Sequence, residues 1–318
     1  PVAMLMLKDD TSVAKTFTGS ADIDYRMHFL PELRAHLGLG LDVSDGKQDL
    51  YIDKANADSH PHGREGWEKV YKTNKSLNTY LQYLNSFGDM HSIDIMGGYE
   101  WQHFYREGSN YYVGLDGYLP QDREWKSENY LVSFFGRINY NLANKYLFTA
   151  TVRNDGSSRF ASDHRWGLFP SFAFAWKISE EGFMRNQRLL SDLKLRLGYG
   201  ITGQQNIMQG DYPYIPVYSE NKDGGYYPVG DEFHSTFRPD AYNKDLKWEE
   251  TTTYNAGIDF GFMNNRFTGA IDYYYRETND LINVIEIPAG TNFKNRVVSN
   301  IGSMTNTGLE FTINGDVI

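Results

Sequence analysis

Apolar and polar residues alternate along most of this chain with a period of two, the pattern of a β-strand with one apolar and one polar face. From residue 17 to residue 29 the odd positions are apolar or glycine, and the even positions are Thr18, Ser20, Asp22, Asp24, Arg26 and His28. The alternation recurs over residues 33–43, 93–102, 130–140, 146–152, 166–178, 193–202, 254–262, 267–275 and 309–313. The pattern predicts an all-β protein of about eleven strands.

Strand length and ring positions favour a membrane barrel over a soluble sandwich. Soluble strands usually run about five or six residues, whereas several of these run about ten, enough for a tilted strand to cross a bilayer. Trp166 and Trp176 lie ten residues apart on one face of a predicted strand. With a tilt of roughly 40°, that spacing projects to about 25 Å, the height of the apolar band between two aromatic girdles. We therefore predict an antiparallel transmembrane β-barrel.

The connections between predicted strands alternate in length. Short ones at 30–32, 87–90, 142–144 and 263–265 take turns with long ones at 44–69, 105–127, 154–164, 203–247 and 278–306. The connection at 179–191, on the short side, is intermediate. Short periplasmic turns opposite long outer loops are typical of outer-membrane barrels.

Composition narrows the classes further. No apolar run reaches the roughly eighteen residues of a transmembrane helix, and a mean hydropathy of -0.57 suits strands that show lipid only every second residue. The chain has no cysteine, which excludes disulfides and thiol chemistry. A net charge of -10 argues against a nucleic-acid partner.

We expect residues 1–318 to be one stretch of a longer barrel. The predicted strand number is odd, whereas single-chain bacterial barrels use an even number. An open sheet would leave unpaired backbone groups in lipid. The chain also starts without a signal peptide and stops in mid-pattern at residue 318.

Several sequence blocks resemble the SusC/RagA family of TonB-dependent outer-membrane transporters. They are YLFTATVR at 146–153, DGSSRF at 155–160, RWGLFPS at 165–171, SDLKLR at 191–196, TGQQ at 202–205, LKWE at 246–249, DYYY at 272–275 and NIGSM at 300–304. Their order and spacing are specific, and the resemblance covers nearly the whole chain, most strongly from residue 128 onward.

This resemblance implies a twenty-two-strand barrel of the Gram-negative outer membrane, of which the chain would supply about half. Family members import oligosaccharides or peptides, carry a plug inside the barrel, are capped by a SusD-like surface lipoprotein and are driven by TonB. We expect the plug and the C-terminal strands to lie outside this chain. Outer-membrane lipid is then a partner, no cofactor is expected, and this stretch alone transports nothing.

Candidate substrate-binding residues come from the rings of the predicted long loops, because a ring offers a flat apolar surface to a sugar face. They are Tyr111, Tyr112, Tyr226, Tyr227 and Phe233. The alternative is that these rings pack the loops together. Charges on the polar face of the strands, such as Arg137 and Arg196, are expected to line a wet lumen.

Other motifs give only weak support for a nucleotide-binding, metal-binding or catalytic site. Residues 198–203 match G-x-G-x-x-G, but no helical pattern follows. His60 and His62 flank a proline without further ligands, which is more typical of a solvated loop than of a metal site. The aspartates at 42, 45 and 49 lack calcium-loop spacing and suggest a turn. The carboxylate pairs at 180–181, 231–232 and 249–250 point opposite ways on a strand, so no catalytic residues are predicted.

Three functions remain open at this point. The first is import of glycans or peptides with a SusD-like partner. The second is a siderophore or cobalamin receptor, also TonB-dependent. The third is a soluble all-β adhesin or carbohydrate-binding protein, which would partition into aqueous buffer without detergent.

Overall fold

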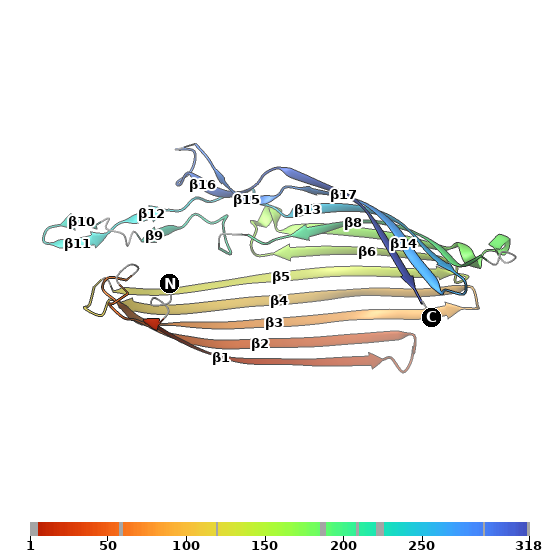
Figure 1. Cartoon of the computed structure of the whole chain (residues 1–318), viewed down its shortest axis with the longest axis horizontal. Coiled ribbons are helices and arrows are strands. Elements are labelled where there is room, and N and C mark those ends of the chain that lie inside the picture. The colour runs from red at the N-terminus through yellow and green to blue at the C-terminus, as the bar shows by residue number, and fades with distance from the viewer. Residues whose placement is uncertain are drawn as a thin grey trace. The chain divides into compact units, whose positions relative to one another are not determined.

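The computed structural model describes residues 6–56, 60–118, 120–184, 189–207, 210–220, 226–288 and 290–316. An 11-stranded sheet dominates it, with the strands paired in sequence order (Figure 1). These strands are β1 (Lys8–Arg26), β2 (Leu33–Ile52), β3 (Arg64–Phe87), β4 (His91–Val113), β5 (Gln121–Leu142), β6 (Tyr146–Ser157), β7 (Trp166–Lys177), β8 (Leu190–Gln204), β13 (Glu249–Phe262), β14 (Phe267–Asn279) and β17 (Ser303–Gly315). The predicted antiparallel all-β fold is confirmed.

Two compact units divide the chain. The first comprises Pro1–Ile23, His36–Thr79 and Glu100–Leu131, and the second comprises Asp24–Ala35, Tyr80–Tyr99 and Val132–Ile318. Strands β1 to β5 contribute residues to both units, whereas β6 to β17 belong to the second.

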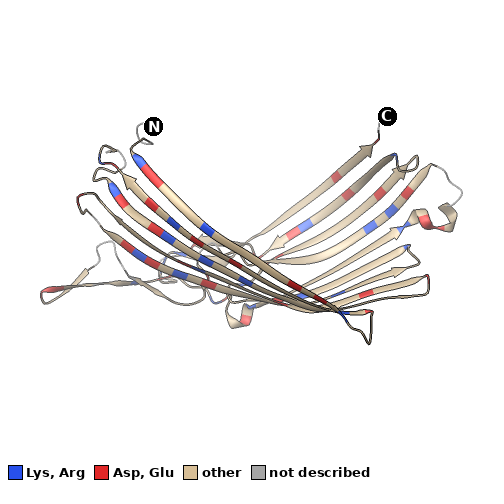
Figure 2. Cartoon of the chain, turned by 90° about the horizontal axis from the view of Figure 1, so that it is seen from below, with Lys and Arg blue, Asp and Glu red and all other residues tan. Residues whose placement is uncertain are grey.

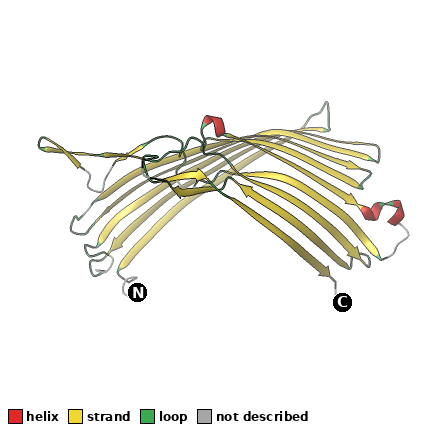
Figure 3. Ribbon diagram, turned by 90° about the horizontal axis from the view of Figure 1, so that it is seen from above, coloured by secondary structure: helices red, strands yellow, loops and turns green. Residues whose placement is uncertain are grey.

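Three short 3-10 helices lie in connections between the strands (Figure 3). They are η1 (Ser162–His164), η2 (Ile178–Glu180) and η3 (Gly182–Met184). No helix in the described part of the chain is long and apolar enough to cross a bilayer.

Strands β2 to β5 are longer than the sequence predicted, at 20, 24, 23 and 22 residues. The prediction of loops over 44–69 and 105–127 is therefore wrong, because the connections shrink to 53–63 and 114–120. A strand whose two faces both meet water needs no apolar alternation, so the pattern stops before the strand does. The alternation of short and long connections itself is confirmed.

Left-handed backbone conformations make two of the short turns. Ala143 and Asn144 have φ of 54° and 56°, and Met263, Asn264 and Asn265 have φ of 53°, 57° and 61°. Tight antiparallel hairpins use such positions, and asparagine tolerates them better than most residues.

The intermediate connection between β7 and β8 is fixed by one carboxylate. Glu181 accepts hydrogen bonds from the Tyr146 hydroxyl at 2.6 Å, the Lys145 ammonium at 3.1 Å and the Trp176 indole at 3.1 Å. These donors, the tyrosine first, lower the pKa of Glu181 from 4.5 to about 2. The turn is thereby tied to the ends of β6 and β7.

The apolar face of the sheet is exposed. Phe134, Phe172 and Ile271 remain 53%, 46% and 39% exposed, respectively. Large apolar residues left open along strand after strand would be an aggregation hazard in water, whereas lipid satisfies them. This arrangement agrees with the prediction that the alternate apolar side chains face hydrocarbon.

A small hydrophobic core at the long-loop ends of β6 to β13 contains several of the buried apolar residues of the protein. Phe160 and Leu246 are fully buried, and Trp248 packs against Phe160 and Phe169 with ring centroids 5.3 Å and 5.4 Å apart. The Trp248 indole also donates to the Arg165 carbonyl at 3.0 Å. The blocks 155–160, 165–171 and 246–249 thus meet in one place, which we call the rim core.

Three two-stranded ribbons rise from the long connections of the second unit. They are β9 (Tyr218–Glu220) with β12 (Phe237–Pro239), β10 (Tyr226–Val229) with β11 (Glu232–Ser235), and β15 (Ile282–Glu286) with β16 (Arg296–Asn300). The β10–β11 ribbon lies at one end of the view in Figure 1.

Candidate functional site

An ion-pair cluster occupies the polar face of β8, β13 and β14. The Arg196 guanidinium donates to Asp259 through Nε at 3.0 Å and through Nη2 at 2.8 Å, and Nη2 also reaches Asp272 at 2.9 Å. Lys194 lies 3.1 Å from Asp259. The strand register places Gly257 opposite Arg196 and Asp272.

Gly257 makes this cluster possible. A Cβ at residue 257 would collide with the Asp272 carboxylate and the Arg196 guanidinium. The glycine therefore provides the space in which the charged groups meet.

Similar pairing continues along the polar face of β4 to β6. Arg153 donates to Asp155 at 2.7 Å and to Ser133 at 2.7 Å. Asp94 accepts from Asn139 at 3.2 Å and lies 3.6 Å from Arg137. The groups named here thus pair with their neighbours along the polar face of β4 to β6, as expected for side chains that line a wet lumen.

The structure separates the two adjacent ring candidates of β4. Successive residues of a strand point to opposite faces. Tyr112 lies on the polar face, with the Arg64 guanidinium 4.3 Å from its ring centroid and its hydroxyl 3.4 Å from Glu68. Tyr111 lies on the other face and is 36% exposed. These two tyrosines cannot stack on the same sugar.

The other three candidates lie on the β10–β11 ribbon and are exposed. Tyr226, Tyr227 and Phe233 are 53%, 67% and 73% exposed. Pro228 pairs with Phe233, so Tyr226 and Phe233 share one face of the ribbon, whereas Tyr227 pairs with His234 on the other. Tyr226 and Phe233 are the pair that one ligand can contact together.

A second polar cluster joins the β2–β3 connection to the β4–β5 connection. The His62 ring stacks on Tyr118 with centroids 3.9 Å apart and contacts Asp116 through Nδ1 at 2.8 Å. This hydrogen bond lowers the pKa of Asp116. Within the described residues no group of three metal-ligating side chains is assembled, and His62 is engaged by Asp116.

Two of the sequence motifs discussed above lie within β-strands. The aspartates at 42, 45 and 49 stand inside β2, so the turn predicted for them is wrong. Asp42 accepts a hydrogen bond from Thr18 of the adjacent strand β1 at 2.9 Å. The glycine motif at 198–203 lies within β8, and the described residues after it form no helix.

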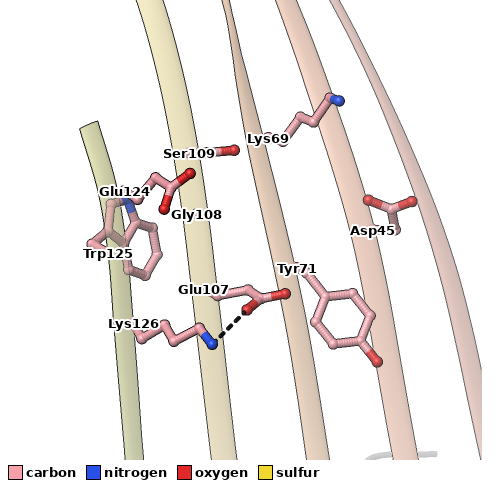
Figure 4. A pocket seen from close by; sticks show the side chains of 9 residues that line it. All are labelled: Asp45, Lys69, Tyr71, Glu107, Gly108, Ser109, Glu124, Trp125 and Lys126. Atoms are coloured by element: carbon pink, nitrogen blue, oxygen red, sulfur yellow. Dashed lines mark ion pairs between the residues drawn. The ribbon is translucent and has the colours of Figure 1, made fainter. Parts of the chain in front are cut away.

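Sequence reasoning missed a pocket on the outer part of β2 to β5. It has a volume of about 540 Å³, and its lining includes Asp45, Lys69, Tyr71, Glu107 and Lys126 (Figure 4). Lys126 and Glu107 form an ion pair at 3.7 Å across β4 and β5. Its residues are far apart in sequence, and all of them except Tyr71 lie in segments read as loops, so no local signal identified it.

Comparisons with known proteins agree with this architecture. Residues 8–316 match the family described as TonB dependent receptor-like, beta-barrel. The chain is 49% identical over its whole length to the TonB-dependent receptor SusC of Bacteroides thetaiotaomicron and covers 32% of it. A TonB-dependent receptor of Formosa agariphila is 32% identical over 99% of the chain, which covers 33% of that protein.

The fold is also found in a solved transporter. The structure of the RagAB peptide transporter aligns with a TM-score of 0.84 at 24% identity, over 98% of this chain and 35% of that chain. This chain spans about a third of the length of the relatives it matches. The resemblance to SusC/RagA proteins is thus confirmed, and the chain belongs to the family of TonB-dependent receptor β-barrels, proteins of the Gram-negative outer membrane.

Proposed function

We propose that the full-length protein imports oligosaccharides across the outer membrane, using TonB and a SusD-like surface lipoprotein. The observation that carries this proposal is the 49% identity to SusC along the entire chain. Peptides are the second cargo class, because the fold is shared with a peptide transporter, although at 24% identity. No catalytic step is assigned to this chain.

We also propose how residues 1–318 contribute. They supply one part of the barrel wall and several outer loops, while the plug and the remaining strands come from the rest of the protein. Strands β1 and β17 are the two edges of the 11-stranded sheet. An edge strand in a membrane needs a partner.

We propose that aromatic side chains of the β10–β11 ribbon contact the substrate. Tyr226 and Phe233 lie on one face of an exposed ribbon in a long connection, and exposed rings of this kind stack on sugar faces. Tyr112 faces the polar side of the wall and is the third candidate. Tyr111, on the opposite face, is the weakest of the five on these grounds.

Growth after deletion of the gene tests the cargo. We expect the deletion strain to lose growth on one class of oligosaccharide as sole carbon source and to keep growth on free monosaccharides. Restoration by the wild-type gene, but not by a version lacking the TonB-binding segment, would establish energised uptake. Normal growth on every oligosaccharide, with a defect on peptides, would move the cargo to the second class.

Each of the other two candidate functions predicts a different experimental result. A growth defect confined to chelated iron or cobalamin would indicate a siderophore or vitamin receptor instead. Recovery of the full-length protein in aqueous buffer without detergent would favour the soluble adhesin. The exposed apolar face of the sheet argues against this last outcome.

A further inference from the structure

A second pocket lies on the polar face of β3 to β5, at the strand ends that meet the long connections. Arg64 begins β3, Tyr112 lies one residue before the end of β4, and Gln121 begins β5. Gln121 shares the phase of Arg137 on β5, which is the polar phase. The pocket has a volume of about 220 Å³, and its lining also includes His60, His62 and Tyr118. We call it the Arg64 pocket.

The walls of the Arg64 pocket are fixed by the backbone. The Leu115 N–H donates to the His62 carbonyl at 3.0 Å, which joins the β2–β3 connection to the β4–β5 connection. The Gly63 N–H donates to the His60 carbonyl at 2.8 Å. Gly63 has a φ of 64°, and a Cβ there would press on the Leu115 side chain and the Ile52 carbonyl, so this position requires glycine. The pocket is therefore built by the fold itself.

The Arg64 guanidinium is positioned but not neutralised. It lies 4.3 Å from the centroid of the Tyr112 ring, and its Nη2 donates to the Gln121 side-chain carbonyl at 3.2 Å. Among the described residues it forms no ion pair with a carboxylate. Other arginines of the polar face each pair with an aspartate, namely Arg137, Arg153 and Arg196.

The described lining of the pocket is basic. It contains one guanidinium, two imidazoles and no carboxylate, although the chain has a net charge of -10. Asp116 contacts His62 from outside this lining. Both acidic and basic residues occur along the strands of the sheet (Figure 2), so a basic pocket is a local feature. An arginine fork binds a carboxylate through two parallel hydrogen bonds, so the pocket suits an anionic group.

An exposed ring gives the pocket a second kind of contact. Tyr118 is 51% exposed, and only a ring with an open surface can pack on a sugar face. Gln121 accepts from Arg64 through its carbonyl, which leaves its amide N–H groups to donate to a ligand. The volume is below the roughly 300–1,000 Å³ of pockets for drug-sized ligands, and it suits a single sugar unit.

A second arginine lies further along the same face. Trp125 follows Gln121 by four residues on β5, about 13 Å along the strand. The Arg106 guanidinium lies 5.0 Å from the centroid of the Trp125 ring and forms no ion pair among the described residues. A Cβ at Gly108 would collide with that ring, so the glycine makes room for it. An extended ligand that starts at Arg64 can thus meet Arg106 as well.

We propose that the Arg64 pocket binds a carboxylated sugar unit, so that the imported oligosaccharide is an acidic one. Arg64 pairs with the carboxylate of this unit, Tyr118 packs on its ring, and Gln121 donates to its oxygens. Arg106 takes the carboxylate of a unit further along the chain. The inference rests on the import function proposed above and names its substrate class.

The experiment is titration calorimetry with the full-length receptor in detergent. The acidic probes are oligogalacturonate, oligomannuronate and a chondroitin oligosaccharide, and the neutral probe is maltohexaose. We expect an acidic probe to bind, and R64Q and R106Q each to weaken its binding about tenfold, because a hydrogen-bonded charge pair is lost. The methyl ester of that probe should bind the wild type about as weakly. The control R266Q removes an exposed arginine from the short turn between β13 and β14 and should bind as the wild type does.

Three results would overturn the inference. The first is binding of maltohexaose but of no acidic probe. The second is equal binding of an acidic probe by the wild type, R64Q and R106Q, with the variants shown to be folded by their heat-modifiable migration on gels. The third is equal binding of the acid and its methyl ester, which needs no variant.

Failure of the import proposal gives a different result. In that case the receptor binds peptides and none of the oligosaccharides, acidic or neutral. Binding of maltohexaose that is unaffected by R64Q would instead leave oligosaccharide import standing and remove only the acidic substrate class.

Discussion

Single residues hold the polar face of the sheet together, and Arg196 is the clearest case. Replacing Arg196 with alanine leaves Asp259 and Asp272 facing each other with Lys194 as the remaining nearby cation. We expect R196A to lower stability by about 1–2 kcal/mol, because hydrogen bonds to charged groups are lost in a partly wet site. Thermal unfolding of the full-length receptor in detergent measures this. The exposed Arg238→Ala in β12 serves as the control and should change stability far less.

Glu181 gives the molecule a defined response to acid. Its pKa in the folded protein, about 2, lies below its ordinary value of 4.5, so its contribution is present above pH 4.5 and is lost as pH falls toward 2. We expect E181Q to unfold at a lower temperature than wild type at pH 7, with the difference vanishing near pH 2. A constant difference across this range would mean that the carboxylate charge does not matter.

At the level of residues, the sequence predicted which face of a strand a side chain occupies better than it predicted which side chains contact each other. It placed Arg137 and Arg196 on the polar face correctly, because alternation alone decides this. It could not predict that Arg196 meets Asp259 and Asp272, because that depends on the register of three strands and on Gly257. For Tyr111 and Tyr112 the local sequence was read as loop, so their opposite faces were overlooked.

Among the elements, the rim core is the one on which the outer loops depend. We expect W248A to cost about 3–5 kcal/mol, as buried aromatic truncations do. It should also expose the connection from residue 205 to residue 248 to protease, because Trp248 is only 5% exposed and packs on Phe160 and Phe169. Limited proteolysis followed by mass spectrometry locates the cuts. Phe237→Ala, at a side chain that is 65% exposed, should leave the cleavage pattern unchanged.

Elements were predictable from the sequence to the extent that lipid imposes a pattern on them. The strands near the short turns, β3 excepted, and the turns themselves were found, because hydrocarbon demands an apolar residue at every second position. The outer parts of β2 to β5 were taken for loops because water on both sides imposes no such demand. The rim core was visible as sequence blocks, but its packing depends on contacts such as Phe160 with Trp248, 88 residues apart in sequence.

For the whole molecule, the orientation of the sheet toward lipid is the property that everything else requires. Ile258 lies on the apolar face of β13 and is 44% exposed, whereas Asn255 lies on the polar face of the same strand. We expect I258R to destabilise the folded receptor by about 2–4 kcal/mol, and N255R by about 1 kcal/mol or less. Urea titrations in lipid vesicles measure both. Equal costs would show that the two faces meet the same surroundings.

The packing of the buried residues Phe160, Leu246 and Trp248 in the rim core also affects which parts of such a receptor can change during evolution. These side chains tie together connections that begin on different hairpins, so altering one of them disturbs all the others. The β10–β11 ribbon is not part of the rim core, so its residues can be substituted one at a time. Under the import function proposed above, new cargo preferences should therefore arise in the ribbon, while the rim core stays as it is.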